Sequence, residues 1–414
     1  VSSQADFIRQ YLNDKIKINY QYLLRYAYCN YNAVYGREEI IYNDIQLQKL
    51  TSLYTIKNNQ ISKSIYWSQK KNTRTSNLTI YDYKKKIKHI FENMISNYVS
   101  INPGKKYAVA LSGGTDSGLI SGLLKKYFSA PDAVSLTYFE NSDFNEEKLI
   151  KESVKKNINT WNNFKLTPKT LLKDLDNNYY RFLDAPLATV SIYGYDYLFR
   201  SASKAGYDLL FTGSGGDYIQ SGNYNNYWYY LADLYLKKNK IFKNELNKWI
   251  HHHSTKVFPK SYKIFLDQIK KKVNFKNHGE LLKQDFVFDK SIINRDLFKD
   301  FSFLKSNQVK NYGTYLKSFM MQEYRYDVAP GVEAEDIMQW ANKISVQSPF
   351  FDKEVAEFGW ELPSNLKIKN GVNKYLYRKA FKDILPYKIV NRTAKSGFNA
   401  PFDQWARNEL KEFI

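Results

Sequence analysis

The chain has 414 residues, of which 43% are hydrophobic, and its formal net charge is +21. Such a length permits two domains with a large core, and the hydrophobic content excludes an intrinsically disordered chain. The sequence has no run of about 18 apolar residues, which a membrane-spanning helix requires. The segment Val1–Asn13 carries Asp6 and Arg9, so it is not a signal peptide, and we expect a cytoplasmic protein without a membrane partner.

The positive charge raises the question of nucleic-acid binding. The lysines are scattered along the chain in short groups, for example Lys84–Lys88, Lys237–Lys243 and Lys270–Lys272. Heavy use of Lys, Asn, Tyr and Ile is also what an AT-rich genome produces. Because a run of like charge is usually a solvated face, we do not expect nucleic acid as a partner.

Residues 1–75 are Tyr-rich, and the segment Asp44–Tyr66 alternates in polarity in places, which predicts a β-hairpin. Apolar residues then recur at helical spacing over Asn77–Asn97. We therefore expect a small β-rich domain at residues 1–75, followed by a larger domain at residues 76–414.

The larger domain alternates strands and helices. Compact apolar runs predict strands at Lys106–Leu111, Ala133–Phe139 and Asp208–Thr212. Helices are expected at Gly118–Tyr127, Asn145–Asn157 and Ile192–Ala205, and residues 223–330 are mostly helical in pattern. This order predicts an α/β fold, in which a doubly wound, mostly parallel sheet carries helices on both faces.

The first motif, Leu-Ser-Gly-Gly-Thr-Asp-Ser at residues 111–117, follows a predicted strand and precedes a helix. Backbone N–H groups and the helix dipole bind an anion at such a junction, and glycines let the backbone approach phosphates closely. The motif lacks the Gly-Lys-Ser/Thr ending of a Walker loop. We expect it to bind ATP through Leu111, Ser112, Gly113, Gly114, Asp116 and Ser117.

The second motif, Thr-Gly-Ser-Gly-Gly-Asp at residues 212–217, ends another predicted strand. It should therefore lie at the carboxyl edge of the same sheet, where ligands bind in open α/β folds. Gly213 and Gly215 are further candidates for ATP binding. Asp116 and Asp217 are placed to share a Mg²⁺ ion, which is commonly held by a few carboxylates and substrate phosphates.

Residues 111–117 resemble the pyrophosphate loop of the ATP pyrophosphatase superfamily, which cuts ATP between the α- and β-phosphates. Other segments resemble the asparagine synthetase family in order and spacing: Asp184–Ala188, Ser348–Asp352, Lys374–Ala380 and Lys395–Phe402. The resemblance covers about residues 40–414 and implies an adenine nucleotide α-hydrolase-like fold. Residues 20–67 resemble the tail of the glutaminase domain that precedes the synthetase domain in that family.

The resemblance also implies roles for individual residues. Lys374 aligns with the family lysine that contacts the phosphates and the tetrahedral transition state, and a compact positive charge suits developing oxyanions. We assign catalysis to Lys374, Asp116 and Asp217. In the family the second motif reads Gly-Glu-Gly-Ser/Ala-Asp-Glu, so Ser214 and Tyr218 replace its two Glu residues. We assign both to the substrate side.

The implied reaction is an AMP-forming amide ligation that uses ATP and Mg²⁺. A carboxylate attacks the α-phosphate, pyrophosphate leaves, and an amine displaces AMP. Asparagine biosynthesis by an amidotransferase is one version, but the loss of Glu at Ser214 puts it in doubt. Lasso-peptide cyclases and β-lactam synthetases, which use an internal amine, are alternatives, as are sugar amidotransferases of polysaccharide biosynthesis.

Two other functions remain open. A tRNA-modifying pyrophosphate-loop enzyme would suit the basic charge, but it gives no reason for segments 349–352 and 397–402. A catalytically inactive relative is the other alternative, and the intact Asp116, Asp217 and Lys374 argue against it.

The glutaminase domain of the family normally begins with a nucleophilic cysteine. This chain begins with Val1, and its single cysteine, Cys29, lies in a Tyr-rich stretch that does not match. One cysteine also excludes an intramolecular disulfide and a cysteine zinc site. We expect a truncated or degenerate glutaminase half. The expected partners are a small-molecule or peptide carboxylate, an amine donor, and either a second copy of the chain or a separate glutaminase or peptide partner.

Overall fold

The computed structural model describes residues 1–12, 16–23, 39–48, 51–68, 77–138, 144–176, 190–253, 261–282, 311–324, 328–393 and 400–413. None of the helices in these ranges is both long and apolar enough to cross a membrane. Cys29, the segment Asp184–Ala188 and most of the segment Lys395–Phe402 lie outside the described residues.

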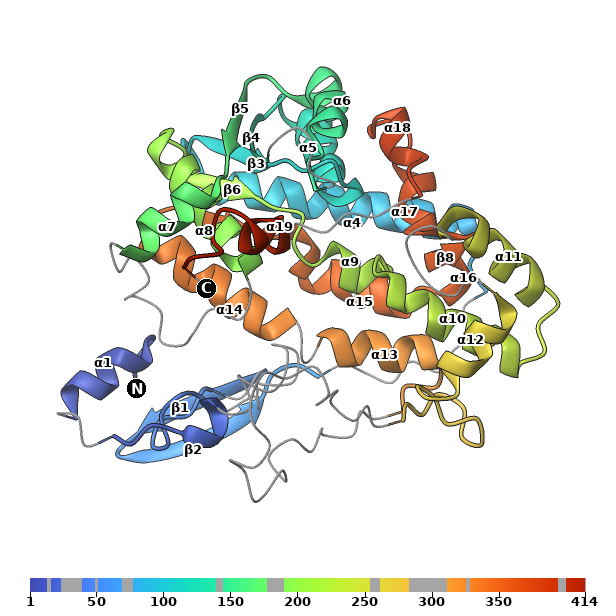
Figure 1. Ribbon diagram of the computed structural model, residues 1–414, viewed down its shortest axis with the longest axis horizontal. Coiled ribbons are helices and arrows are strands. Elements are labelled where there is room, and N and C mark those ends of the chain that lie inside the picture. The colour runs from blue at the N-terminus through green and yellow to red at the C-terminus, as the bar shows by residue number, and fades with distance from the viewer. Residues whose placement is uncertain are drawn as a thin grey trace.

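Figure 1 shows a central sheet surrounded by helices, with a separate hairpin near the N-terminus. The strands are β1 (Ser52–Lys57), β2 (Gln60–Ile65), β3 (Tyr107–Ala110), β4 (Asp132–Thr137), β5 (Trp161–Lys165), β6 (Leu209–Phe211), β7 (Ser345–Gln347), β8 (Ile368–Lys369) and β9 (Val372–Asn373). The helices before β6 are α1 (Ala5–Tyr11), α4 (Ile80–Ser100), α5 (Thr115–Tyr127), α6 (Glu147–Asn157), α7 (Pro168–Asp176) and α8 (Val190–Lys204). Those after β6 are α9 (Gly216–Gln220), α10 (Tyr224–Leu236), α11 (Phe242–His253), α12 (Tyr262–Ile269), α13 (Tyr315–Glu323), α14 (Ala329–Ala341), η6 (Pro349–Phe351), α15 (Lys353–Glu361), α16 (Ser364–Lys367), α17 (Tyr375–Ala380), α18 (Tyr387–Val390) and α19 (Phe402–Arg407).

The central sheet has the strand order β5-β4-β3-β6-β7. Each neighbouring pair in it is parallel. From β3 the chain winds outward through β4 and β5, and then returns to the other side of β3 with β6 and β7. The winding therefore reverses between β3 and β6, and ligands of open α/β folds bind outside the carboxyl ends of the strands at such a point. The predicted doubly wound parallel sheet is confirmed.

Side chains of the central strands alternate between two hydrophobic clusters. Val109 and Phe211 belong to a cluster with residues of α4, α5 and α10. Their neighbours in the chain, Ala108 and Leu210, belong to a second cluster with residues of α8 and α19. Because successive strand residues point to opposite faces, the sheet is covered on both sides, as the sequence predicted.

Two strands of the central sheet were not predicted from the sequence. β5 has the sequence Trp-Asn-Asn-Phe-Lys, and β7 is only three residues long, Ser-Val-Gln. They occupy the two edges of the sheet, where polar residues are tolerated because one side of the strand lacks a partner. Neither segment has the apolar run that marks the buried strands β3, β4 and β6.

The predicted hairpin in Asp44–Tyr66 is confirmed as β1 and β2, which pair antiparallel from Ser52–Ile65 to Lys57–Gln60. The segment after it is anchored to the main body. The Trp67 indole donates a 2.8 Å hydrogen bond from Nε1 to Glu357 of α15, and its ring lies 5.7 Å from that of Trp360. The division of the chain into domains at residues 1–75 and 76–414 stays a prediction.

Candidate functional site

Three segments meet at the carboxyl edge of the sheet. The first motif connects β3 to α5, the second connects β6 to α9, and the segment Ser348–Asp352 follows β7. Since β3, β6 and β7 are neighbours, the ends of all three lie together. A 2.8 Å hydrogen bond between the Thr212 and Ser348 hydroxyls joins the second segment to the third. Sequence segments that are far apart therefore form one site.

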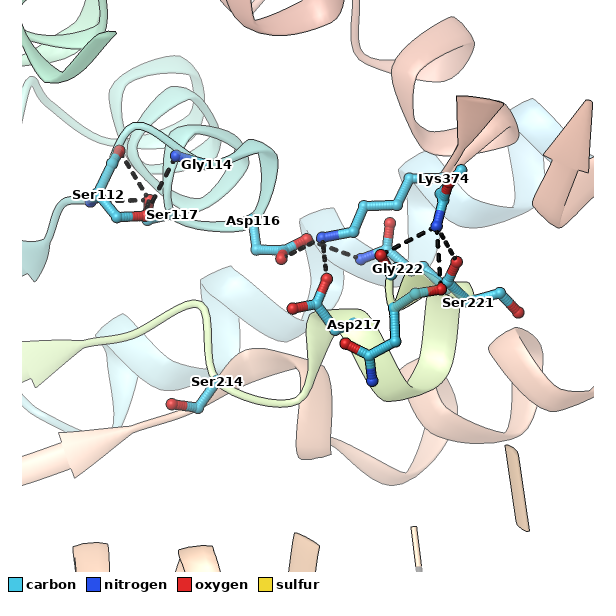
Figure 2. Close-up of polar contacts among 12 residues, drawn as sticks. Ser112, Gly114, Asp116, Ser117, Ser214, Asp217, Ser221, Gly222 and Lys374 are labelled. Carbon is cyan, nitrogen blue, oxygen red and sulfur yellow. Dashed lines mark hydrogen bonds and ion pairs between the residues drawn. The ribbon is translucent and has the colours of Figure 1, made fainter. Parts of the chain in front are cut away.

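The first motif forms a tight turn closed by its own serines. Ser117 Oγ accepts a 3.0 Å hydrogen bond from Ser112 N and lies 2.9 Å from Ser112 Oγ. Ser112 Oγ also accepts the N–H of Gly114. Figure 2 shows these bonds at the start of α5. The helix begins at Thr115 and not at Gly118 as predicted, so Asp116 and Ser117 lie in its first turn, where the helix dipole is positive.

Gly113 is held from both sides by a partly buried ion pair. Its N–H donates to Glu146 Oε2 at 3.2 Å, and its carbonyl accepts from Arg392 Nη1 at 2.9 Å. Arg392 Nη2 and Glu146 Oε1 are 2.6 Å apart. We call this arrangement the Gly113 clamp. It ties the phosphate loop to a segment about 280 residues later in the chain.

Lys374 joins the first and second motifs. Its ammonium group forms an ion pair with Asp116 and a second one, 2.7 Å long, with Asp217 Oδ1. Figure 2 shows the lysine side chain reaching between the two carboxylates. Gln220 Nε2 donates to Asp116 at 3.3 Å. The three residues that the sequence assigned to catalysis are therefore brought together in direct contact.

Two glycines allow Asp116, Asp217 and Lys374 to come this close to one another. A Cβ on Gly216 would lie 2.4 Å from the Asp116 carboxyl carbon, and one on Gly222 would lie 1.9 Å from Asp217 Oδ1 and 2.6 Å from the Lys374 side chain. These separations are far below van der Waals contact. Any larger residue at either position would push the carboxylates and the lysine apart.

The backbone around Lys374 is strained and held in place. Lys374 has a φ of 57°, in the left-handed region, where it precedes α17. The Asn373 side chain donates 2.9 Å hydrogen bonds to the carbonyls of Ser221 and Gly222. Arg378 Nε donates to the Asn373 carbonyl at 3.0 Å. Strained backbone of this kind persists only when its surroundings fix it, and it is concentrated at functional sites.

This centre places one ammonium group between two carboxylates. Burial lowers the pKa of Lys374, but the fields of Asp116 and Asp217 outweigh burial and leave the pKa above its ordinary value. The lysine is thus a fixed cation at neutral pH. It lies where two carboxylates from separate elements converge, which is a position that favours positive charge.

The same two carboxylates fit a divalent cation that binds together with nucleotide. Mg²⁺ takes oxygen ligands and is usually held by one or two carboxylates with substrate phosphates. Among the described residues there is no group of three or more His, Cys, Asp or Glu side chains that could hold a metal ion alone. Asp116 and Asp217 therefore suit an ion that is completed by phosphate oxygens.

A second polar cluster lies on the other side of the second motif. Ser214 Oγ donates a 3.0 Å hydrogen bond to Glu335 Oε1, which comes from α14. Burial raises the pKa of Glu335 to about 7, although the bond from Ser214 opposes the shift. Burial, together with the nearby charge of Glu335, also raises the pKa of Tyr195 on α8, which interacts with Ser214 as well. This cluster holds a carboxyl group that titrates near neutral pH.

The remaining predicted residues have varied positions. Leu111 is buried in a hydrophobic cluster with Ala133 and Ile150, and its backbone N–H bonds to Val134 O of β4 at 2.8 Å. Gly213 packs on the Asp116–Ser117 backbone, and Gly215 precedes α9 against Phe351. Tyr218 is partly buried in α9, next to Asp217. The ATP and substrate roles of these residues stay predictions.

Sequence reasoning missed Glu146, Arg392 and Glu335. Arg392 had no role or partner assigned from the sequence. Glu146 and Glu335 each stand beside another acidic residue, Glu147 and Asp336 respectively, and acidic residues ordinarily face solvent. One signal for Glu335 was available in the sequence. Ser214 replaces the Glu that the family carries in the second motif, which suggests that another element could supply the carboxylate.

Comparisons with known proteins agree with this geometry. A sequence profile of the family described as asparagine synthase matches residues 103–414. The chain is 27% identical over 324 residues to the glutamine-hydrolyzing asparagine synthetase 1 of Bacillus subtilis strain 168, covering 73% of this chain and 48% of that relative. The chain thus spans about half the length of the curated relative that it matches.

Solved structures show only a distant likeness. The glutamine-dependent NAD⁺ synthetase of Acinetobacter baumannii in complex with ADP is 13% identical, covers 83% of this chain and 55% of its own, and has a TM-score of 0.25. The NMN synthetase of Francisella tularensis is 15% identical, covers 36% of this chain and 60% of its own, and has a TM-score of 0.23.

Proposed function

Because the chain belongs to the asparagine synthase family, we propose that it is an ATP-dependent amide-forming ligase that activates a carboxylate as its acyl adenylate and transfers the acyl group to an amine. The observation that carries the proposal is the contact of Lys374 with both Asp116 and Asp217. It joins the two nucleotide motifs and the family lysine at one point beside a phosphate-binding turn.

ATP phosphates would bind at the first motif. The first motif lies at the N-terminus of α5, where backbone N–H groups and the helix dipole attract anions. The Gly113 and Gly114 amides donate to Glu146 and Ser112 in this structure, and they would exchange these partners for phosphate oxygens when nucleotide binds. Asp116 and Asp217 would hold Mg²⁺, which supplies charge neutralisation on the phosphates. Lys374 then exchanges its carboxylate contacts for phosphate oxygens as the nucleotide enters, since a lysine ammonium is a mobile point charge.

The chain's own residues would act mainly by position and charge. The substrate carboxylate attacks the α-phosphorus, the bond to the β-phosphate oxygen breaks, and pyrophosphate leaves. Lys374 stabilises the negative charge that develops on the transferring and leaving oxygens. Holding the reactants in line supplies much of the remaining rate acceleration.

The acceptor amine distinguishes this chain from plain asparagine formation. Ser214 stands where the family carries Glu in the second motif. We therefore propose that the acceptor is an amine of a small molecule or peptide, as in the lasso-peptide cyclases, β-lactam synthetases and sugar amidotransferases, and that free ammonia with aspartate is a poor substrate pair.

Exchange of labelled pyrophosphate into ATP tests the proposal. The purified chain is given ATP, Mg²⁺ and a panel of carboxylates that includes aspartate, sugar acids and peptides with free side-chain carboxylates. At least one carboxylate should stimulate exchange, and the amine that most increases AMP release should complete amide formation. If no carboxylate stimulates exchange and no amine increases AMP release, the proposed function is wrong.

A further inference from the structure

The second motif carries two polar clusters that face different partners. Asp217 points to Lys374, whereas Ser214, three residues earlier, bonds to Glu335. Figure 2 shows the Ser214 side chain directed away from the Asp116–Lys374–Asp217 centre. One short loop thus contributes Asp217 to the Lys374 centre at its end and contacts a separate carboxyl group, Glu335 of α14, through Ser214.

Glu335 is fixed in this place by its helix. Gln339, one turn later on α14, accepts the Val346 N–H of β7 at 2.8 Å. Asn342, at the end of the helix, donates a 2.7 Å bond to Asp196 of α8. The carboxyl group therefore comes from a helix anchored to both the sheet and its neighbouring helix, and a rigid element positions a functional group more accurately than a loop does.

We propose that the Glu335 carboxylate takes the proton that the acceptor amine gives up in the transfer step, so that helix α14 supplies the carboxylate that the second motif lacks at Ser214. The inference rests on the proposed ligase function. The amine nitrogen attacks the acyl carbon and a C–N bond forms. The bond from the acyl carbon to the AMP oxygen breaks, AMP leaves with the electron pair, and one N–H proton passes to Glu335.

The surroundings of Glu335 suit a base. Ser214 donates to Oε1 of the carboxylate and so holds that oxygen in place. Oε2 has no hydrogen-bond partner among the residues that the structure describes, and the incoming amine would meet this second oxygen. The titratable group that faces Glu335 across this cluster is Tyr195, which in turn feels the charges of Asp217 and Tyr138. Burial places the pKa of Glu335 near neutral pH, and a general base works best when its pKa lies near the operating pH.

The test separates adenylation from transfer. Glu335→Gln keeps the shape of the side chain and removes its basicity. With the carboxylate and amine identified in the exchange assay, this variant should retain pyrophosphate exchange within about twofold while amide formation falls by roughly 10²–10⁴-fold. Exchange also reports that the variant is folded. Unchanged amide formation in Glu335→Gln would overturn the inference and leave the proposed ligase function intact.

Asp336 offers a matched control. It is the next residue on α14, it is exposed, and its carboxylate accepts a bond from Gln339. Asp336→Asn should leave both half-reactions unchanged. An equal loss of amide formation in Asp336→Asn would show that any charge change on this helix slows transfer, which would contradict a specific role for Glu335.

The pH profile and a rescue sharpen the test. In the unaltered protein the transfer rate should rise as Glu335 deprotonates and level off above about pH 7, and this inflection should be missing in Glu335→Gln. Adding Ser214→Glu to that variant returns a carboxylate to the second motif. The rate of amide formation in the double variant should be at least about tenfold higher than in Glu335→Gln alone. An unchanged inflection, or no recovery in a double variant that still exchanges, would contradict the inference.

Discussion

The two sides of the second motif differ in how they are built. On the phosphate side, three charged groups, Asp116, Asp217 and Lys374, contact one another and come from three motifs that are recognisable in the sequence. The other side, which we call the acceptor side, consists of Ser214, Glu335 and Tyr195. Of these three residues only Ser214 belongs to a motif, and its partner Glu335 comes from a helix with no recognisable sequence signature. In the proposed function, chemistry on ATP would depend on residues within the motifs, whereas the choice of acceptor would depend on residues outside them that can change independently.

This comparison has a practical consequence. Changes on the phosphate side should abolish every reaction of the protein, including exchange. Changes on the acceptor side should spare exchange and affect only transfer.

Removal of a shared carboxylate should have the largest effect. Asp116→Ala should reduce pyrophosphate exchange to background, because it removes a candidate Mg²⁺ ligand and leaves buried Lys374 with half of its counter-charge. Asp217→Asn should behave in the same way. Circular dichroism would confirm folding. Normal exchange in either folded variant would refute the assignment of the phosphate side.

Lys374→Ala should lower kcat of adenylation by about 10²–10³-fold, which is the usual cost of losing one group that stabilises transition-state charge. The affinity for ATP should change much less, because the charge is needed mainly while bonds are made and broken. Lys374→Arg should not recover full activity, since a planar fork replaces a point charge. A variant with weak ATP binding but normal kcat would contradict this role.

The Gly113 clamp should have a smaller effect. Arg392→Lys loses the fork that reaches both the Gly113 carbonyl and Glu146, so the KM for ATP should rise roughly tenfold, as expected for a lost charge-assisted hydrogen bond. Glu146→Gln keeps an acceptor for the Gly113 N–H and should cost less. Initial exchange rates against ATP concentration measure both. If Arg392→Lys and Glu146→Gln lower kcat to the same extent and leave the KM for ATP unchanged, the Gly113 clamp does not shape the first motif for ATP binding.

The smallest predicted effect is on stability. The pKa of Glu335 in the folded protein is about 7, above the unfolded value of about 4.3. Between these values the folded state holds the proton more tightly, so its stability falls as pH rises through this window. Glu335→Gln removes the titration. When the pH is raised from 5 to 8, the Tm of Glu335→Gln should therefore fall by less than the Tm of the unaltered protein, and the two decreases should differ by roughly 2 °C or more. The control variant Asp336→Asn should show the same decrease as the unaltered protein.

The phosphate side was predictable because its residue types and their place in the chain are dictated by local chemistry. A strand that ends in Ser-Gly-Gly and opens a helix is typical of a phosphate-binding turn, and the parallel order of β3 and β6 then places Asp116 near Asp217. Lys374 required the family resemblance as well, because a single lysine among many carries no local signal.

The acceptor side and the Gly113 clamp were not predictable in this way. Glu335, Glu146 and Arg392 meet their partners across 121, 33 and 279 residues of sequence. Their functional contacts depend on which helix face turns toward the sheet edge, and the edge strand β7, which fixes α14, was itself too short to predict. Packing of distant elements, and not local pattern, decides such contacts.

The most direct test of the whole account is the fate of oxygen from the carboxylate substrate. The carboxylate that best stimulates exchange is prepared with ¹⁸O in its carboxyl group, and the AMP released during amide formation is analysed by mass spectrometry. If the protein forms an acyl adenylate, one ¹⁸O atom should appear in AMP for each amide formed, in the unaltered protein and in the residual turnover of Glu335→Gln. AMP without ¹⁸O, or release of ADP and phosphate in place of AMP and pyrophosphate, would contradict it.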